Sequence, residues 1–174
     1  MAFALEVKSI DSTGHFAGYA SVFDIVDNQK DIMMQGAFAA TLKKGAGAIK
    51  LLWQHQQDEP IGVFEKMFED AVGLYVEGRL LLDVQKGREA FALLKSGAVT
   101  GLSIGYSPTR YTIDSATGVR LLAEVDLFEV SLVTFPANAA AKVTVVKSAK
   151  KSAEPVDLIH LQDALDKALT TLRT

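Results

Sequence analysis

A serine flanked by two glycines constrains this chain more than any other stretch of its sequence. The run Thr100-Gly101-Leu102-Ser103-Ile104-Gly105-Tyr106 alternates small residues with large ones. If the run is a β-strand, alternation puts the serine and both glycines on one face and the large side chains on the other. Glycine weakens a strand interior, because it costs backbone entropy and has no side chain to pack. Two glycines beside one hydroxyl therefore indicate that other atoms approach this backbone closely.

The overall composition is that of a globular protein. The 174 residues suffice for one domain with a hydrophobic core and a tail, and 49% of them are hydrophobic. A net charge of −3 gives no indication of a nucleic-acid surface or a polybasic membrane contact. The absence of cysteine excludes disulfides, thiolate metal sites and a cysteine nucleophile. Because we find neither a signal peptide nor a run of ~20 apolar residues, we expect a soluble, cytoplasmic protein.

Alternating apolar residues predict a mainly β domain with few helices. The strands are expected at 3–10, 15–23, 48–55, 61–68, 73–82 and 142–147, besides the serine strand and a long strand at 119–135. Two helices are expected, a short one at 36–44 and a clearer one at 85–96. The segment 56–60 is predicted as a turn, and the aspartate-rich segment 24–31 as an ordered loop. That loop lacks the glycine and the closing glutamate of an EF-hand, so no metal site is expected.

The chain has three histidines for imidazole chemistry. His15 borders a turn and is expected at a solvated edge, and His160 lies in the tail. His55 ends a predicted strand on the same face as Leu51 and Trp53, where neighbours could set the pKa of a half-buried imidazole. The alternative for His55 is a structural role in the core.

The long strand at 119–135 carries one carboxylate on its buried face. By alternation, Glu129 shares a face with Val125, Leu127, Ser131 and Val133. A buried carboxylate is costly unless another group pairs with it, and an inward imidazole would be such a partner. Asp126 falls on the other face and is predicted to be a solvated charge.

His55, Ser103 and Glu129 together supply the parts of a serine hydrolase triad: base, nucleophile and orienting carboxylate. Two other interpretations remain. The run Gly101–Gly105 matches the G-x-S-x-G elbow of α/β-hydrolases, but a strand and not a helix is predicted after Ser103. The second alternative is a non-catalytic barrel, whose inward polar residues satisfy one another.

Several motifs, in order along residues 3–147, resemble the prohead (capsid maturation) proteases of tailed bacteriophages, distant relatives of herpesvirus assemblin. These motifs are Gly18-Tyr19-Ala20-Ser21-Val22-Phe23-Asp24, Gly36-Ala37-Phe38, Leu52-Trp53-Gln54-His55, Pro60-Ile61-Gly62, Gly101-Leu102-Ser103-Ile104-Gly105-Tyr106, Glu129-Val130-Ser131-Leu132-Val133 and Pro136-Ala137-Asn138.

The resemblance implies an α+β, mainly β fold: an assemblin-like β-barrel with flanking helices. It implies a serine endopeptidase without cofactor or metal, located in the procapsid interior within the host bacterial cytoplasm. Its substrate would be the scaffold protein or the scaffolding segment of the major capsid protein, and also the protease itself, and a homo-oligomer is possible. Ser103 would be the nucleophile and His55 the base. Glu129 is preferred as third member, with Asp126 as the alternative, and oxyanion donors are expected near 136–139.

The C-terminal part differs in composition from the protease domain at 1–147. Residues 148–155 are predicted to be a linker, because they are small, polar and charged. Residues 156–174 are predicted to form an amphipathic helix with leucines at helical spacing. This tail could pack on the domain, pair with a second copy, carry the protease into the prohead through scaffold contacts, or be removed by self-cleavage.

Overall fold

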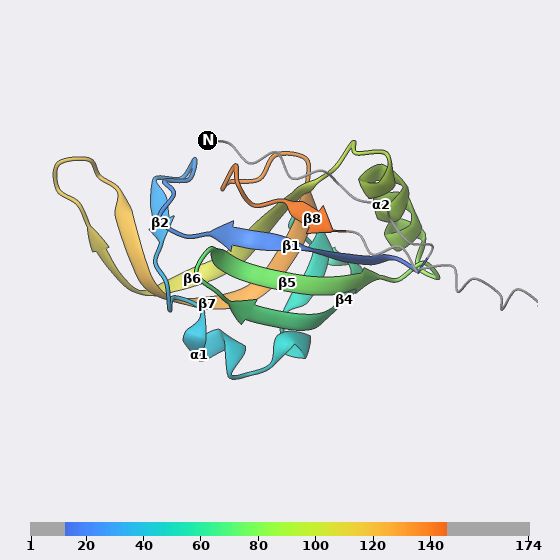
Figure 1. Ribbon diagram of the computed structural model, residues 1–174, viewed down its shortest axis with the longest axis horizontal. Helices are drawn as coiled ribbons and strands as arrows, with labels where there is room; N and C mark the ends of the chain where they lie inside the picture. Colours follow the sequence, from blue (N-terminus) through green and yellow to red (C-terminus); the bar gives the residue numbers. More distant parts are fainter. Residues whose placement is uncertain (1–12, 146–174) are drawn as a thin grey trace, which may run out of the picture.

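The computed structural model describes residues 13–145, and almost all of its regular structure is β-sheet (Figure 1). The strands are β1 (His15–Val22), β2 (Asp31–Met33), β3 (Lys50–Trp53), β4 (Gln56–Glu69), β5 (Gly73–Leu80), β6 (Gly101–Ile113), β7 (Arg120–Val133) and β8 (Val143–Val145). The helices are α1 (Ala39–Leu42), the 3-10 turn η1 (Ala46–Ala48) and α2 (Gln85–Lys95). The predicted strand at 3–10, the linker and the tail helix lie outside the described residues.

All eight strands belong to one sheet with the order β2-β7-β3-β4-β5-β1-β8, and β6 pairs with β7. The long strand β7 organises this sheet, because β6 runs antiparallel to it along nearly its whole length. Two short strands run parallel to β7: β2 beside residues 120–122 and β3 beside residues 129–132. The end of β7 that carries Glu129 therefore lies between the serine strand and the strand that leads to His55.

The sheet curls until its two ends meet beside the serine. Gly101, at the start of β6, forms an isolated antiparallel bridge with Lys142, just before β8. The Leu102 N–H donates to the Ala141 carbonyl (3.0 Å), and the Val143 N–H donates to the Thr100 carbonyl (2.9 Å). The expected mainly β, assemblin-like barrel is confirmed. Because its closure lies at the start of β6, the backbone around Ser103 is held from both sides.

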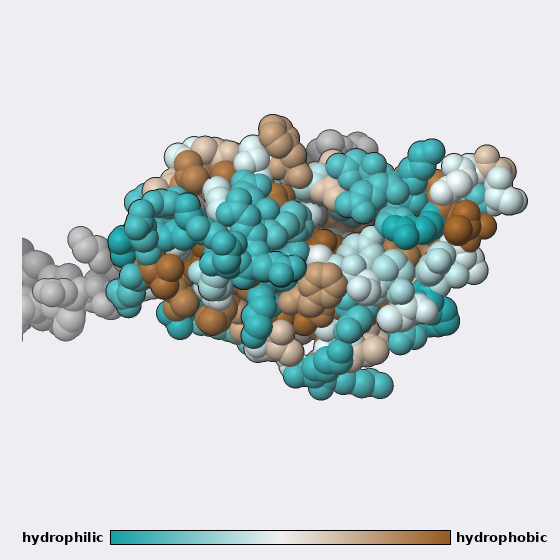
Figure 2. Space-filling view, turned by 180° about the vertical axis from the view of Figure 1, so that it is seen from behind, coloured by the Kyte–Doolittle hydropathy of each residue, from teal (hydrophilic) through white to brown (hydrophobic). Residues whose placement is uncertain are grey.

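Apolar side chains from all sides of the curled sheet fill its interior. The fully buried ones include Phe16, Ile61, Leu74, Val76, Leu80, Leu102, Leu122, Val130 and Leu132. Helix α2 adds Ala90 and Leu94 to the buried set, whereas Leu93 is exposed. Seen from behind, polar and charged side chains alternate with smaller hydrophobic areas on the surface (Figure 2). No helix among residues 13–145 is long and apolar enough to cross a membrane.

Two expectations around His55 are wrong. The predicted strand 48–55 ends at Trp53, and the segment 56–60, predicted as a turn, is the first part of β4. The turn consists of Gln54 and His55, which both have positive φ (50° and 62°), and Trp53 pairs with Gln56 across it. Positive φ at both central residues is characteristic of the type I′ hairpin turn, which normally contains Asn or Gly. Because neither residue is present, this turn could not be predicted from the local sequence.

Candidate active site

The turn after β3 carries His55 toward the buried face of β7. The His55 Nδ1 lies 2.6 Å from the Glu129 Oε1, and the imidazole side chain is 44% exposed while the carboxylate is 8% exposed. The hydrogen bond to Glu129 raises the pKa of His55 above its ordinary value of 6.5, although partial burial opposes the shift. The structure thus pairs the two groups that the sequence singled out on separate strands, 74 residues apart.

The Glu129 carboxylate is held at both oxygens. Its second oxygen, Oε2, accepts a hydrogen bond from the Ser131 hydroxyl at 2.8 Å. Glu129 lies opposite Gly105 in the β6–β7 ladder, and a Cβ built on that glycine would lie only 2.1 Å from Oε1. Glycine is therefore required at 105, because the carboxylate occupies the space of its missing side chain.

Ser103 lies on the same side of the sheet as the carboxylate. It pairs with Ser131 in the β6–β7 ladder, and cross-strand partners point to the same face. The alternation predicted for the serine strand is therefore confirmed. The prediction that Glu129 shares a face with Val125 and Leu127 is wrong, because the register shifts between Gly105 and Tyr106 and Leu127 pairs with Tyr106 on the opposite face. Ser103 is only 6% exposed. Ser103 is therefore two residues from Glu129 in register, on the face of the sheet that carries the carboxylate.

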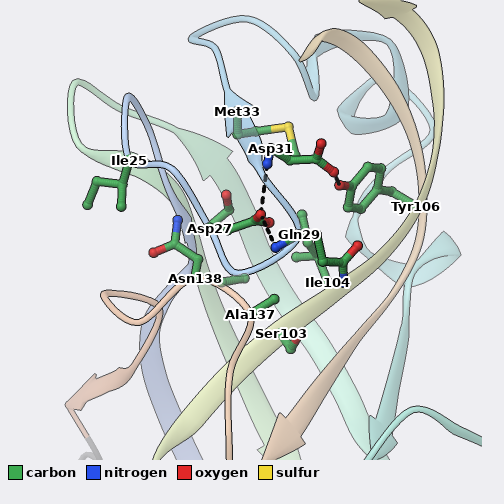
Figure 3. Close-up of a pocket in the computed structure, with 12 residues that line it drawn as sticks. Ile25, Asp27, Gln29, Asp31, Met33, Ser103, Ile104, Tyr106, Ala137 and Asn138 are labelled. Carbon is green, nitrogen blue, oxygen red and sulfur yellow. Dashed lines mark hydrogen bonds between the residues drawn. The ribbon is translucent and has the colours of Figure 1, made fainter. Parts of the chain in front are cut away.

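Two adjoining cavities meet at Ser103. An open groove is lined by Ser103 and His55 together with Gln29, Ile104, Gly105, Tyr106, Pro108, Arg120 and Phe128. A more enclosed pocket is also lined by Ser103, and Figure 3 shows Asp27, Gln29 and Asp31 on one side of it and Ala137 and Asn138 on another. Ser103 and His55 share the groove, but no hydrogen bond joins them among the described residues. Such bonds are often long in free enzymes and shorten when substrate binds.

An ion pair contributes to the lining of both cavities, since Asp31 lines the enclosed pocket and Arg120 lines the groove. Asp31, whose side chain is 1% exposed, accepts hydrogen bonds from the Arg120 Nε (2.6 Å) and Nη2 (2.5 Å). The Tyr106 hydroxyl donates to the same carboxylate at 2.6 Å, and burial with this carboxylate raises the pKa of Tyr106. Asp27 accepts from the backbone N–H groups of Gln29 and Asp31. The segment 24–31 is thus an ordered loop, as predicted.

The other candidate residues lie elsewhere. Asp126 is 53% exposed and forms an ion pair with Lys44 (2.7 Å), away from His55, in keeping with a solvated charge. His15 lies near the edge of β1, with its Nε2 3.4 Å from Glu65. His160 lies outside the described residues. Within residues 13–145 no group of three or more His, Cys, Asp or Glu side chains could hold a metal ion.

Sequence reasoning missed three features of this site. It assigned no role to Ser131, it did not connect Gly105 with Glu129, and it did not pair Asp31 with Arg120. The first two could have been found by aligning 101–105 with 129–133 as antiparallel neighbours, since that register puts each serine and each glycine opposite its partner. The ion pair joins residues 89 apart and had no local pattern.

The curled sheet of this chain is a fold that is also found in solved viral proteases. The fold is similar to that of the bacteriophage T4 capsid assembly protease gp21, with a TM-score of 0.51 and 14% identity over 76% of this chain and 82% of that one. It is also similar to the KSHV protease solved with a hexapeptide phosphonate inhibitor, with a TM-score of 0.50 and 12% identity over 74% and 63% of the two chains. At these identities the likeness shows the fold alone.

The chain belongs to the caudovirus prohead serine protease family, whose model matches residues 3–156. It is 37% identical over 139 residues to the prohead protease of Enterobacteria phage HK97, a match that covers 78% of this chain and 61% of that protein. It is 36% identical over 152 residues to the capsid polyprotein of Pseudomonas phage PAJU2, covering 83% of this chain and 22% of that one. The chain thus spans less than two thirds of these relatives. The family expected from the motifs is confirmed.

Proposed function

We propose that this chain is a serine endopeptidase of capsid maturation, with Ser103 as nucleophile, His55 as general base and Glu129 as the acid that orients the imidazole. The observation that carries this proposal is the 2.6 Å contact between His55 Nδ1 and Glu129 Oε1, in a groove that also contains Ser103. Membership of the prohead serine protease family supports the same reaction class. Asp126 is the less favoured third member, because Lys44 already pairs with it.

In this mechanism Glu129 fixes the tautomer of His55. When Nδ1–H donates to the carboxylate, Nε2 keeps its lone pair and can accept the proton of the Ser103 hydroxyl. The serine oxygen then attacks the scissile carbonyl, and the imidazolium returns the proton to the leaving amine. Water hydrolyses the resulting acyl-enzyme by the same proton transfers in the second half of the cycle, which regenerates the free serine.

The segment 136–139 is the proposed source of oxyanion donors. Ala137 and Asn138 line the enclosed pocket beside Ser103 (Figure 3). The backbone N–H groups of these two residues donate to no other group among the described residues, so they are available to a ligand. Unpaired backbone donors next to a nucleophile are the usual components of an oxyanion hole.

The proposed substrates are the scaffold protein or the scaffolding segment of the major capsid protein, and the protease itself, inside the procapsid of the host bacterium. Two relatives favour a capsid-related substrate. One is called a prohead protease, and the other is a capsid polyprotein in which the segment similar to this chain makes up only 22% of the length. A protease segment joined to a capsid chain would act on a neighbouring capsid segment.

Of the two alternative functions, one is wrong and one stays a proposal. The α/β-hydrolase interpretation is wrong, because β6 continues as a strand ten residues beyond Ser103, to Ile113, where that fold needs a sharp turn and a helix. The non-catalytic barrel stays a competing proposal. One observation favours it: His55, Glu129 and Ser131 satisfy one another's hydrogen bonds without any ligand.

Labelling with a fluorophosphonate, which reacts with activated serines, distinguishes the enzyme from the non-catalytic barrel. We expect the full-length chain to be labelled and the Ser103→Ala variant not to be, while Ser107→Ala on the same strand is labelled normally. Co-expression with the cognate capsid protein is the second measurement. Processing should stop for Ser103→Ala and His55→Ala and continue for His15→Ala. Processing that persists in Ser103→Ala, with no wild-type labelling, would establish the non-catalytic barrel.

A further inference from the structure

We propose that Ser131 is a positioning residue, whose hydroxyl holds the Glu129 carboxylate and the His55 turn in their working arrangement. This inference rests on the proposed protease function and adds a residue to its site. It starts from two facts: Ser131 is completely buried, and both of its side-chain hydrogen bonds go to the other two polar residues of the site.

The turn that carries His55 does not hold its shape by local preference. Gln54 and His55 both have positive φ, a backbone region that non-glycine residues rarely occupy. Conformations of this kind persist only where surrounding contacts impose them. The contacts here come from the end of β7: the Gln54 N–H donates to the Leu132 carbonyl (3.0 Å), and the Gln54 Nε2 donates to the Thr134 hydroxyl (2.8 Å). The His55 N–H donates to the Ser131 hydroxyl oxygen at 3.0 Å.

The hydrogen-bonding roles of Ser131 follow from its partners. A backbone N–H can only donate, so the Ser131 oxygen accepts from His55 and its single proton remains for Glu129 Oε2, at 2.8 Å. With Oε2 engaged in this way, Oε1 faces the His55 Nδ1. One hydroxyl therefore sets the rotation of the carboxylate and also the backbone position of the imidazole that this carboxylate orients.

Thr41 offers a matched control for the loss of a buried hydroxyl. Its Oγ1 also makes two hydrogen bonds with β7, donating to the Val125 carbonyl (3.2 Å) and accepting from the Leu127 N–H (3.0 Å). Neither bond involves His55 or Glu129. The Thr41→Val variant thus removes a buried hydroxyl of α1 that also bonds to β7, and we expect it to leave the arrangement of His55 and Glu129 unchanged.

The experiment compares full-length wild type, Ser131→Ala and Thr41→Val in two measurements. The first is the rate of fluorophosphonate labelling at saturating probe, together with the probe concentration at half-saturation. We expect Ser131→Ala to lower the maximal rate about 10- to 100-fold at unchanged half-saturation, as for a displaced catalytic group.

The second measurement is the pKa of His55 by NMR, with His15 and His160 as internal references. The charged groups near His55 are Glu129, which contacts its ring, and Arg120, which lines the same groove. We expect the pKa of His55 to fall toward 6.5 in Ser131→Ala alone.

Each outcome decides the inference. Ser131 is not a positioning residue if the Ser131→Ala variant keeps the wild-type His55 pKa, or if Thr41→Val reduces labelling as strongly as Ser131→Ala does. If the wild type is not labelled but Ser131→Ala still lowers the His55 pKa, the positioning role stands and the proposed protease function fails. If the wild type and Ser131→Ala are both labelled at the normal rate, the proposed protease function stands and the positioning role of Ser131 fails.

Discussion

Gly105 lies directly opposite Glu129 across the β6–β7 ladder, and the Glu129 carboxylate occupies the space where a side chain at 105 would be. The absence of one Cβ on the serine strand thus allows the carboxylate of the neighbouring strand to reach His55. The second glycine of the run, Gly101, has a different neighbour, since a Cβ there would lie 2.8 Å from Pro136 and from the Val133 carbonyl. Each glycine beside Ser103 therefore makes room for identifiable neighbours: the Glu129 carboxylate at Gly105, and Pro136 with the Val133 carbonyl at Gly101.

We expect Gly105→Ala to displace the Glu129 carboxylate and to reduce Ser103 labelling about 100-fold, as for a misplaced catalytic group. The reason is the 2.1 Å approach of the added Cβ to Oε1. Gly47→Ala is the control, because nothing lies within 4 Å of a Cβ at that position. Normal labelling of Gly105→Ala would mean that the carboxylate does not need its present position.

Exchange of the two candidate acids for amides should separate them. Glu129→Gln keeps the shape of the side chain but no longer stabilises the imidazolium, and a comparable change in a serine protease triad costs about 10⁴ in turnover. We expect a labelling rate lowered by about 10² to 10⁴ for Glu129→Gln and unchanged for Asp126→Asn. The reverse pattern would make Asp126 the third member of the triad.

The pH dependence of labelling should report the His55–Glu129 pair. A general base works only when neutral, and the carboxylate raises the pKa of His55 above 6.5. We therefore expect the acid limb of the labelling rate to have its midpoint above pH 6.5, and Glu129→Gln to move that midpoint down toward 6.5. A midpoint that Glu129→Gln leaves in place would assign the limb to another group.

The raised pKa of His55 affects stability in the opposite direction to labelling, because it stabilises the fold at low pH, where labelling is slow. Because the folded-state pKa of His55 is raised, the stabilisation from this pair is fully present below pH 6.5 and is lost as the pH rises through the raised pKa. Denaturant unfolding of the wild type and of His55→Ala across this range measures the effect. The difference in unfolding free energy between the two should shrink in the pH window where labelling appears.

The buried ion pair beside the groove should dominate the stability of the β6–β7 hairpin. Arg120→Ala would leave the Asp31 carboxylate buried without its cation, and removing one partner of a buried pair costs about 3–5 kcal/mol. Arg110→Ala on the same hairpin removes an exposed pair with Glu124 and should cost about 0–1 kcal/mol. Equal unfolding free energies for the two variants would contradict this account.

Sequence alternation determined which residues near the serine share a face. In β6 it put Ser103 and both glycines on one face, and in β7 it put Glu129 and Ser131 on one face. It failed beyond Glu129, where the register shifts and Leu127 lies on the opposite face. The clear helix was also predictable, since α2 spans Gln85–Lys95 and Gly97 follows it with φ of 75°. These features depend on interactions between near neighbours in the chain, and such interactions leave a periodic pattern.

Only the tertiary structure decided which of these polar residues meet. The turn at Gln54 and His55 has no glycine or asparagine to indicate it, and its backbone is held by contacts from a strand more than 70 residues later. The register of β6 against β7, which explains Gly105, is likewise a long-range choice. Alternation encodes the face of a strand but neither its partner nor its register, so the buried acid was visible in the sequence and its imidazole neighbour only in the fold.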